Sequence, residues 1–177
     1  QQRSSAASDV YKRQGIMNIL VVQNRMGMGD LVIFMPFIEA ISKKYKVPIT
    51  CLVKKNSKAN EIFQDNEFIK EFIFLERGNG KGDHDGITGS IKLISKIRRY
   101  NFDKIFIFNS SLRFFLISKI AGISDVYHYP LFEKNQQHII LTAQKFLKDS
   151  INVDVESNPV INISCLLYTS PSPRDVH

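Results

Sequence analysis

The turn Gly27-Met28-Gly29-Asp30 is the segment of this sequence best suited to chemistry. It follows a short aliphatic run and precedes a segment whose apolar residues recur at helical spacing. Glycines allow a ligand to approach the backbone, and the start of a helix offers unpaired N–H groups and the positive end of its dipole. The Asp30 carboxylate could cap that helix, or it could act as a general base beside a ligand.

This turn departs from the fingerprint of a dinucleotide-binding site. The pattern G-x-G-x-x-G requires a third glycine, and Val32 occupies that position. A bulky residue there opposes the close packing of helix against strand that such a site uses. The sequence therefore disfavours an NAD-dependent oxidoreductase, although the turn could still bind a phosphate or another anion.

A second group of polar residues, Asn109 to Ser111 and Arg113, follows the aliphatic run 104–108. Arg113 could bind the carboxylate or phosphate of an anionic ligand, because its planar guanidinium matches both groups. It could equally be a solvated surface arginine. Ser111 could line the same site or belong to the turn, and Arg25 in the first glycine turn is similarly ambiguous.

No metal site is predicted from the histidines or cysteines. His84 lies between two aspartates in the glycine-rich segment 77–89, and no further ligand follows at metal-binding spacing. We expect this segment to be a mobile polar loop. His128 and His138 have no Cys or Glu at ligand spacing, so we interpret them as structural.

The elements that would position these residues alternate between strand and helix. Short apolar runs predict strands at 18–22, 49–53, 68–75, 104–108 and 126–129, with another extended run at 160–163. Helices are predicted from Asp30, with a kink or early break at Pro36, and then at 57–63 capped by Ser57, 90–100, 112–121 ended by Gly122, and 138–148. In the helix 90–100 we expect Ile91, Ile94 and Ile97 to form the buried face.

This alternation predicts an α/β fold with a mostly parallel sheet and helices on both faces. In such sheets ligands bind beyond the carboxyl ends of the strands, where both polar segments fall. The 177 residues carry 24 Lys and Arg, 17 Asp and Glu and a net charge of +7, and no apolar run reaches the length of a membrane span. No aromatic-plus-basic motif accompanies the lysines, so no nucleic-acid partner is predicted.

The two ends of the chain do not look like protein. Codons for residues 4–14 and 165–175 can include GATGTGTATAAGAGACA and TGTCTCTTATACACATC, which are reverse complements, as in transposase-type sequencing adapters. We therefore expect non-native tails at 1–14 and 165–177 around a biological segment 15–164. Without the tails, Lys and Arg fall to 20, Asp and Glu fall to 15, and the net charge becomes +5. Only Cys51 then remains, which excludes an intrachain disulfide.

The segment 17–53 resembles the start of glycosyltransferase family 9, the heptosyltransferases of lipopolysaccharide core synthesis. The shared order is a strand, a turn containing Gly29-Asp30, a helix with Pro36 six residues after the aspartate, and a second strand. The segment 101–129 is similar to a second marker of the family. That marker is carried by Asp103, Ser111, Arg113, Ala121 and Gly122, and His138 at the start of a helix also fits.

This resemblance implies the N-terminal, acceptor-side Rossmann-like domain of a bacterial GT-B enzyme, whose C-terminal donor domain is absent. It implies an inverting transfer of heptose or a similar sugar to a lipopolysaccharide-type acceptor, with Asp30 as general base. Gly29, Ser111 and Arg113 would bind that lipid-linked saccharide. The co-substrate would be a nucleotide-sugar such as ADP-heptose, bound through the missing domain, with no metal and no other cofactor.

The resemblance also implies a cytoplasmic protein that touches the inner membrane peripherally, and a fragment that is inactive by itself. The alternative is a non-enzymatic nucleotide- or anion-binding α/β module.

Overall fold

A five-stranded parallel sheet forms the centre of the molecule. The computed structural model describes residues 17–24, 28–63, 65–76, 84, 86–130 and 139–156. The strands are β1 (Ile19–Gln23), β2 (Ile49–Lys54), β3 (Ile69–Leu75), β4 (Lys104–Ile107) and β5 (Asp125–His128). They lie in the order β3-β2-β1-β4-β5, and every neighbouring pair is parallel. The predicted Rossmann-like α/β fold is confirmed.

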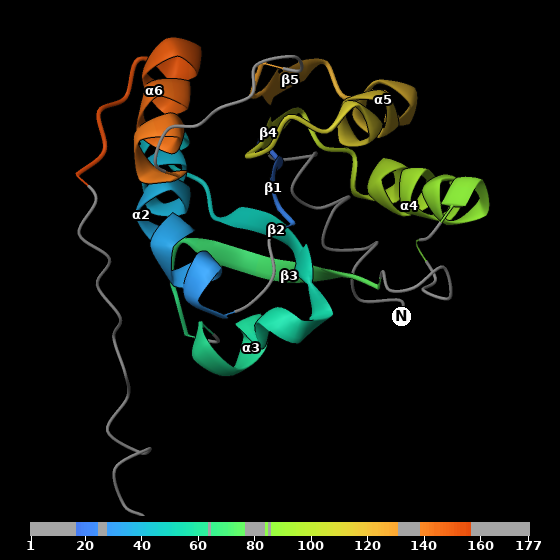
Figure 1. Ribbon diagram of the computed structural model, residues 1–177, viewed down its shortest axis with the longest axis horizontal. Coiled ribbons are helices and arrows are strands. Elements are labelled where there is room, and N and C mark those ends of the chain that lie inside the picture. Colours follow the sequence, from blue (N-terminus) through green and yellow to red (C-terminus); the bar gives the residue numbers. More distant parts are fainter. Residues whose placement is uncertain are drawn as a thin grey trace, which may run out of the picture.

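Helices cover both faces of this sheet (Figure 1). They are α2 (Met28–Tyr45), α3 (Ala59–Ile62), α4 (Gly86–Tyr100), α5 (Leu112–Ala121) and α6 (Ile139–Ile151), with a short 3-10 turn, η1 (Lys55–Ser57). The pair α2 and α6 packs on one face, and the pair α4 and α5 packs on the other. In chain order, each of the long helices α2, α4, α5 and α6 follows a strand.

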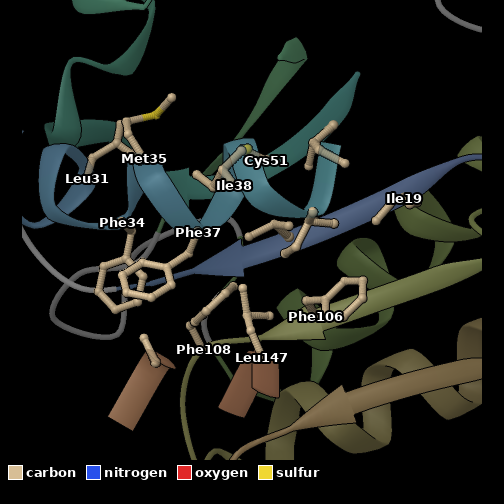
Figure 2. Packing of buried hydrophobic residues seen from close by; sticks show 14 of the residues in the cluster. Ile19, Leu31, Phe34, Met35, Phe37, Ile38, Cys51, Phe106, Phe108 and Leu147 are labelled. Carbon is tan, nitrogen blue, oxygen red and sulfur yellow. The ribbon is translucent and has the colours of Figure 1, made fainter. Parts of the chain in front are cut away.

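Alternating side chains of the strands supply two separate cores, as period-two geometry requires. On the face of α2, Val21 and Cys51 pack with a group of aromatic rings. On the face of α4 and α5, the neighbouring residues Leu20 and Val22 pack instead. Phe108 joins the first core, where its ring meets Phe34, Phe37, Tyr129 and Phe146. Figure 2 shows the first two of these rings on α2 directed toward Phe108.

The direction of the chain across the sheet reverses between β1 and β4. From β1 the chain moves outward to β2 and β3, and it then crosses back to β4 and β5. Val22 consequently pairs with Leu52 on one side and Ile107 on the other. A reversal of this kind leaves an opening between the loops at the carboxyl ends of the two central strands, where ligands of such folds bind.

Of the two alternatives predicted at Pro36, the early break is wrong and the kink stays a prediction. The helix α2 continues for 18 residues through the proline, although proline removes one backbone donor. Buried side chains precede and follow Pro36, among them Phe34, Phe37 and Ile41. Because these side chains anchor both halves of the helix on the sheet, tertiary packing outweighs the local cost.

Two further sequence predictions are corrected. The helix α4 begins at Gly86, inside the predicted loop, and its buried side chains are Leu93 and Ile97, whereas Ile91 is exposed. Ser57 does not cap a helix, because it lies in η1 and Lys58 precedes α3. Its buried hydroxyl has no hydrogen-bond partner within the described residues.

The end of α5 is as predicted. Gly122 has a φ of 88°, and its N–H binds the carbonyl of Lys119. Several predictions fall outside the described residues. They concern the tails 1–14 and 165–177, the glycine-turn residues Arg25 and Gly27, the loop residues 77–83, His138, and the extended run 160–163.

Candidate functional site

The loops that follow β1 and β4 are joined at the carboxyl edge of the sheet. The side-chain amide of Asn109 donates to Oδ1 of Asn24 at 2.9 Å. Oδ1 of Asn109 in turn accepts the backbone N–H of Ser111 at 2.8 Å. Asn109 therefore holds the turn before α5 and ties it to the first loop. Asn24 had no distinguishing signal in the sequence, because its role depends on a residue 85 positions away.

Asp30 lies in the first turn of α2, the helix that follows β1 in the chain. It is the third residue of the helix rather than the residue that caps it. Its side chain is half-buried, and no hydrogen bond or ion pair to it is formed within the described residues. A carboxylate in this position is stabilised by the positive end of the helix dipole and keeps its oxygen atoms for another partner.

Gly29 is exposed next to this carboxylate. A Cβ atom added at Gly29 would meet no heavy atom within 4 Å. The first turn of a helix also has backbone N–H groups without partners inside the helix. The two residues thus present an open stretch of backbone and one carboxylate at the reversal point of the sheet.

Arg113 lies in the first turn of α5 and is directed toward α4. Its Nε donates to the hydroxyl of Ser90 at 3.1 Å, and its Nη2 donates to the backbone carbonyl of His84. The guanidinium thus connects α5 to the start of α4. Ser111 precedes the helix at the cap position, but its hydroxyl makes no capping hydrogen bond.

His84 is buried and fixed, so the prediction of a mobile polar loop is wrong at this residue. Its N–H binds the carbonyl of Glu76 at 2.9 Å, and its Nδ1 accepts the N–H of the same residue at 3.1 Å. Gly89 packs directly against its backbone. Neither His84 nor Ser90 was predicted to contact Arg113, because the contact joins residues 29 and 23 positions apart.

The predicted site residues share one edge of the sheet but form two groups. Asp30 and Gly29 belong to α2, which packs on the face of the first core. Ser111 and Arg113 belong to α5 and its approach, on the opposite face. No hydrogen bond between described residues is formed from Arg113 to Asp30, because the guanidinium binds Ser90 and His84. A ligand bound by both groups would have to span the edge between them.

The described residues hold no group of three or more His, Cys, Asp or Glu side chains that could bind a metal ion. Within the same residues, no helix is both long and apolar enough to cross a membrane. The predicted independence from metal and cofactor stays a prediction.

Comparison with solved structures places this fold beside glycosyltransferases. The crystal structure of a glycosyltransferase of family 9 from Veillonella parvula matches with a TM-score of 0.65 at 18% identity, over 84% of this chain and 46% of that chain. The E. coli ADP-heptose lipopolysaccharide heptosyltransferase II matches with 0.58 at 16% identity, over 84% and 47%. E. coli heptosyltransferase WaaC with ADP matches with 0.55 at 12% identity, over 80% and 50%.

The chain spans about half the length of each of these structures. No protein-family model matches the sequence, and no curated protein matches it either. At these identities the similarity shows the fold. The resemblance that the sequence motifs indicate is thus confirmed at the level of the fold.

Proposed function

We propose that this chain is the acceptor-side half of an inverting glycosyltransferase of family 9. The observation that carries the proposal is the match of the described fold to one half of three transferases that share this fold. The position of Asp30 supports it, since this carboxylate, which has no partner among the described residues, follows the central strand at the reversal point of the sheet. The donor we propose is a nucleotide-sugar such as ADP-heptose, and the acceptor is a lipid-linked saccharide of the lipopolysaccharide type.

In the proposed reaction Asp30 is the general base. Its carboxylate takes the proton from an acceptor hydroxyl while the oxygen of that hydroxyl forms a bond to the anomeric carbon of the donor sugar. The bond from that carbon to the nucleotide diphosphate breaks on the opposite side, which inverts the configuration. Most of the donor contacts would come from a second domain, so this chain would be inactive by itself.

The exposed backbone at Gly29 would face the acceptor in this proposal. A Cβ has free space there, so a saccharide could approach the chain as closely as a glycine allows. Arg113 needs a different role from the one predicted, because its guanidinium already binds His84 and Ser90. We therefore propose that Arg113 mainly holds α5 in place beside the site. A contact between Arg113 and the acceptor would be a second role.

The second candidate is a non-enzymatic module that binds a nucleotide or another anion. The open first turn of α2 favours it, because unpaired N–H groups at a helix start attract phosphate. A titration of the full chain with ADP, monitored by calorimetry, distinguishes the transferase from the binding module. The transferase proposal expects little affinity for ADP, whereas tight binding that Gly29→Val abolishes would favour the module.

The first test of the transferase proposal is the genomic sequence downstream of the codon for Ser164. We expect a second Rossmann-like half there, and a stop codon soon after that codon would contradict the proposal. The second test replaces Asp30 by Asn in the full-length enzyme. Loss of a general base lowers kcat by about 10²–10⁴-fold. Glu39→Gln is the matched control, because Glu39 lies on the same helix in an ion pair with Lys43.

A further inference from the structure

Two asparagine side chains bridge the carboxyl ends of the two central strands. Asn24 follows Gln23, the last residue of β1, and Asn109 lies two residues after the last residue of β4. The amide Nδ2 of Asn109 donates to Oδ1 of Asn24 at 2.9 Å. The strands are adjacent and parallel, and beyond β4 the N–H of Phe108 still binds the carbonyl of Val22 at 3.1 Å. The asparagine pair therefore lies at the reversal point of the sheet, where ligands of such folds bind.

A chain of hydrogen bonds fixes how the two amide groups are turned. The backbone N–H of Ser111 can only donate, so the oxygen Oδ1 of Asn109 faces it, at 2.8 Å. The Nδ2 group of Asn109 then points to Asn24, and only the oxygen of the Asn24 amide can accept from it. The Nδ2 group of Asn24, which carries two N–H donors, is left at the end of the chain. Asn109 thus decides that Asn24 offers a donor rather than an acceptor to another molecule.

This remaining donor group can be reached from outside the molecule. The Nδ2 group of Asn24 donates to no acceptor among the described residues, and it is not one of their enclosed polar atoms. Asn24 as a whole is half-buried. A ligand that binds to a side chain already held in one orientation loses little free energy to the ordering of that side chain. Asn24 therefore has an accessible donor and a fixed geometry, both of which suit recognition.

The polar groups at this edge of the sheet suit the hydroxyl groups of a saccharide. Asp30, six residues after Asn24, supplies an acceptor, and Asn24 supplies a donor. A hydroxyl group serves both, because it donates through its hydrogen and accepts through its oxygen. An inorganic phosphate would meet the negative charge of Asp30. Two basic residues of this edge are already engaged, since Arg113 binds neighbouring elements and Lys55 is paired with Glu76.

We infer that Asn24 binds a hydroxyl group of the acceptor sugar, and that Asn109 is a positioning residue that holds the Asn24 amide in its donating orientation. The inference rests on the proposed function and adds a specificity-determining residue to it. Asp30 would bind the hydroxyl that reacts. Asn24, at the other end of the turn that leads from β1 into α2, would bind a different hydroxyl of the same sugar. An acceptor without that hydroxyl would leave the amide unpaired and would bind more weakly.

Nuclear magnetic resonance of the full chain tests this inference without any catalysis. The probes are the core oligosaccharide of lipopolysaccharide, freed of its lipid, and inorganic phosphate in a parallel titration. We expect the assigned side-chain amide signals of Asn24 to shift with the oligosaccharide and to stay in place with phosphate. The inference is overturned if the oligosaccharide does not bind, if it binds without moving these signals, or if phosphate moves them as much.

Three variants and a matched control separate the roles of the two asparagines. Asn24→Ala is expected to weaken oligosaccharide binding about fivefold, the usual net effect of one neutral hydrogen bond. Asn109→Ala should weaken it by no more than that, and the double variant should bind like Asn24→Ala alone, because Asn109 acts through Asn24. The control, Asn60→Ala, removes an exposed asparagine of α3 and should keep the parental affinity. Thermal unfolding followed by circular dichroism confirms that each variant is folded. Parental affinity of Asn24→Ala, or a further loss in the double variant, would overturn the inference.

Kinetics of the full-length enzyme distinguish a failure of this inference from a failure of the proposed function. There Asn24→Ala should raise the KM for the acceptor about fivefold and leave kcat and the KM for the donor unchanged. Sugar transfer with a parental acceptor KM in this variant would overturn the inference and leave the transferase proposal intact. Oligosaccharide binding through Asn24 in an enzyme that transfers no sugar would reject the transferase and support the inference.

Discussion

Replacement of Gly89 by alanine should destabilise the protein, although alanine is the better helix former. Gly89 is the fourth residue of α4 and is buried. A Cβ atom there would lie 2.3 Å from the carbonyl carbon of His84, 2.6 Å from its Cα and 2.8 Å from its carbonyl oxygen. All three atoms are backbone, so no side-chain rotation can relieve the contact. The helix or the segment at His84 would have to move.

The segment at His84 is held on several sides, which sets the size of the effect. Its backbone and ring bind Glu76, and its carbonyl accepts from Arg113. Forcing extra volume into a packed site costs about 1–3 kcal/mol. Alanine recovers up to about 1 kcal/mol of helix propensity. We therefore expect the free energy of unfolding of Gly89→Ala to fall by about 1–2 kcal/mol, and by more if the bonds to His84 break.

The matched control is Gly29→Ala, which introduces the same side chain in the first turn of another helix. Nothing lies within 4 Å of the added Cβ there, and we expect no loss and a gain of up to about 1 kcal/mol. Urea unfolding of the full chain, followed by circular dichroism, measures both. If Gly89→Ala is as stable as the parent or more stable, the close approach between α4 and His84 does not exist and the reasoning fails.

Four further predictions concern single side chains. Arg113→Gln should lower the free energy of unfolding by about 2 kcal/mol, because it removes charge-assisted hydrogen bonds; an unchanged thermal transition would leave a ligand-binding role as the better explanation. Burial raises the pKa of the Cys51 thiol, so in a Cys165→Ser variant a thiol reagent should react only after denaturation; fast labelling of the native chain would contradict this. Ser57→Ala should leave stability unchanged or raised, since its hydroxyl has no partner in the described part of the chain; a helix-capping role would instead give a loss of about 1 kcal/mol. Phe108→Ala should cost about 3–5 kcal/mol in urea unfolding, because four aromatic rings contact this side chain; a loss below about 1 kcal/mol would mean that the core closes around the gap.

The strands could be located from the sequence because each is a short aliphatic run between polar residues. All five predicted strands are present, within a residue or two of their predicted bounds. A strand buried on both faces needs apolar residues at every position, and β1 is buried throughout. The C-terminal end of α5 could be predicted for a similarly local reason, because Gly122 adopts a backbone conformation that favours glycine.

Residues within helices were harder to assign, because two physical effects compete there. Pro36 has a local cost that predicts a break, yet the buried residues around it hold α2 together. On α4, Ile91 and Leu93 are both apolar, and each belongs to a line of apolar residues at helical spacing. Periodicity cannot choose between two such lines. The contact with the sheet selects Leu93 and leaves Ile91 exposed.

The sequence by itself thus determined the parallel α/β architecture, the edge of the sheet at which the candidate site residues lie, and the position of Asp30 after the first strand. These features depend on residues close together in the chain. Only the tertiary structure decided the partners of Arg113 and Asn109, because their contacts join segments 23 to 85 residues apart. It also decided which apolar side chains face the sheet and which face outward. Burial is a property of the packed elements, and a local pattern of residues does not contain it.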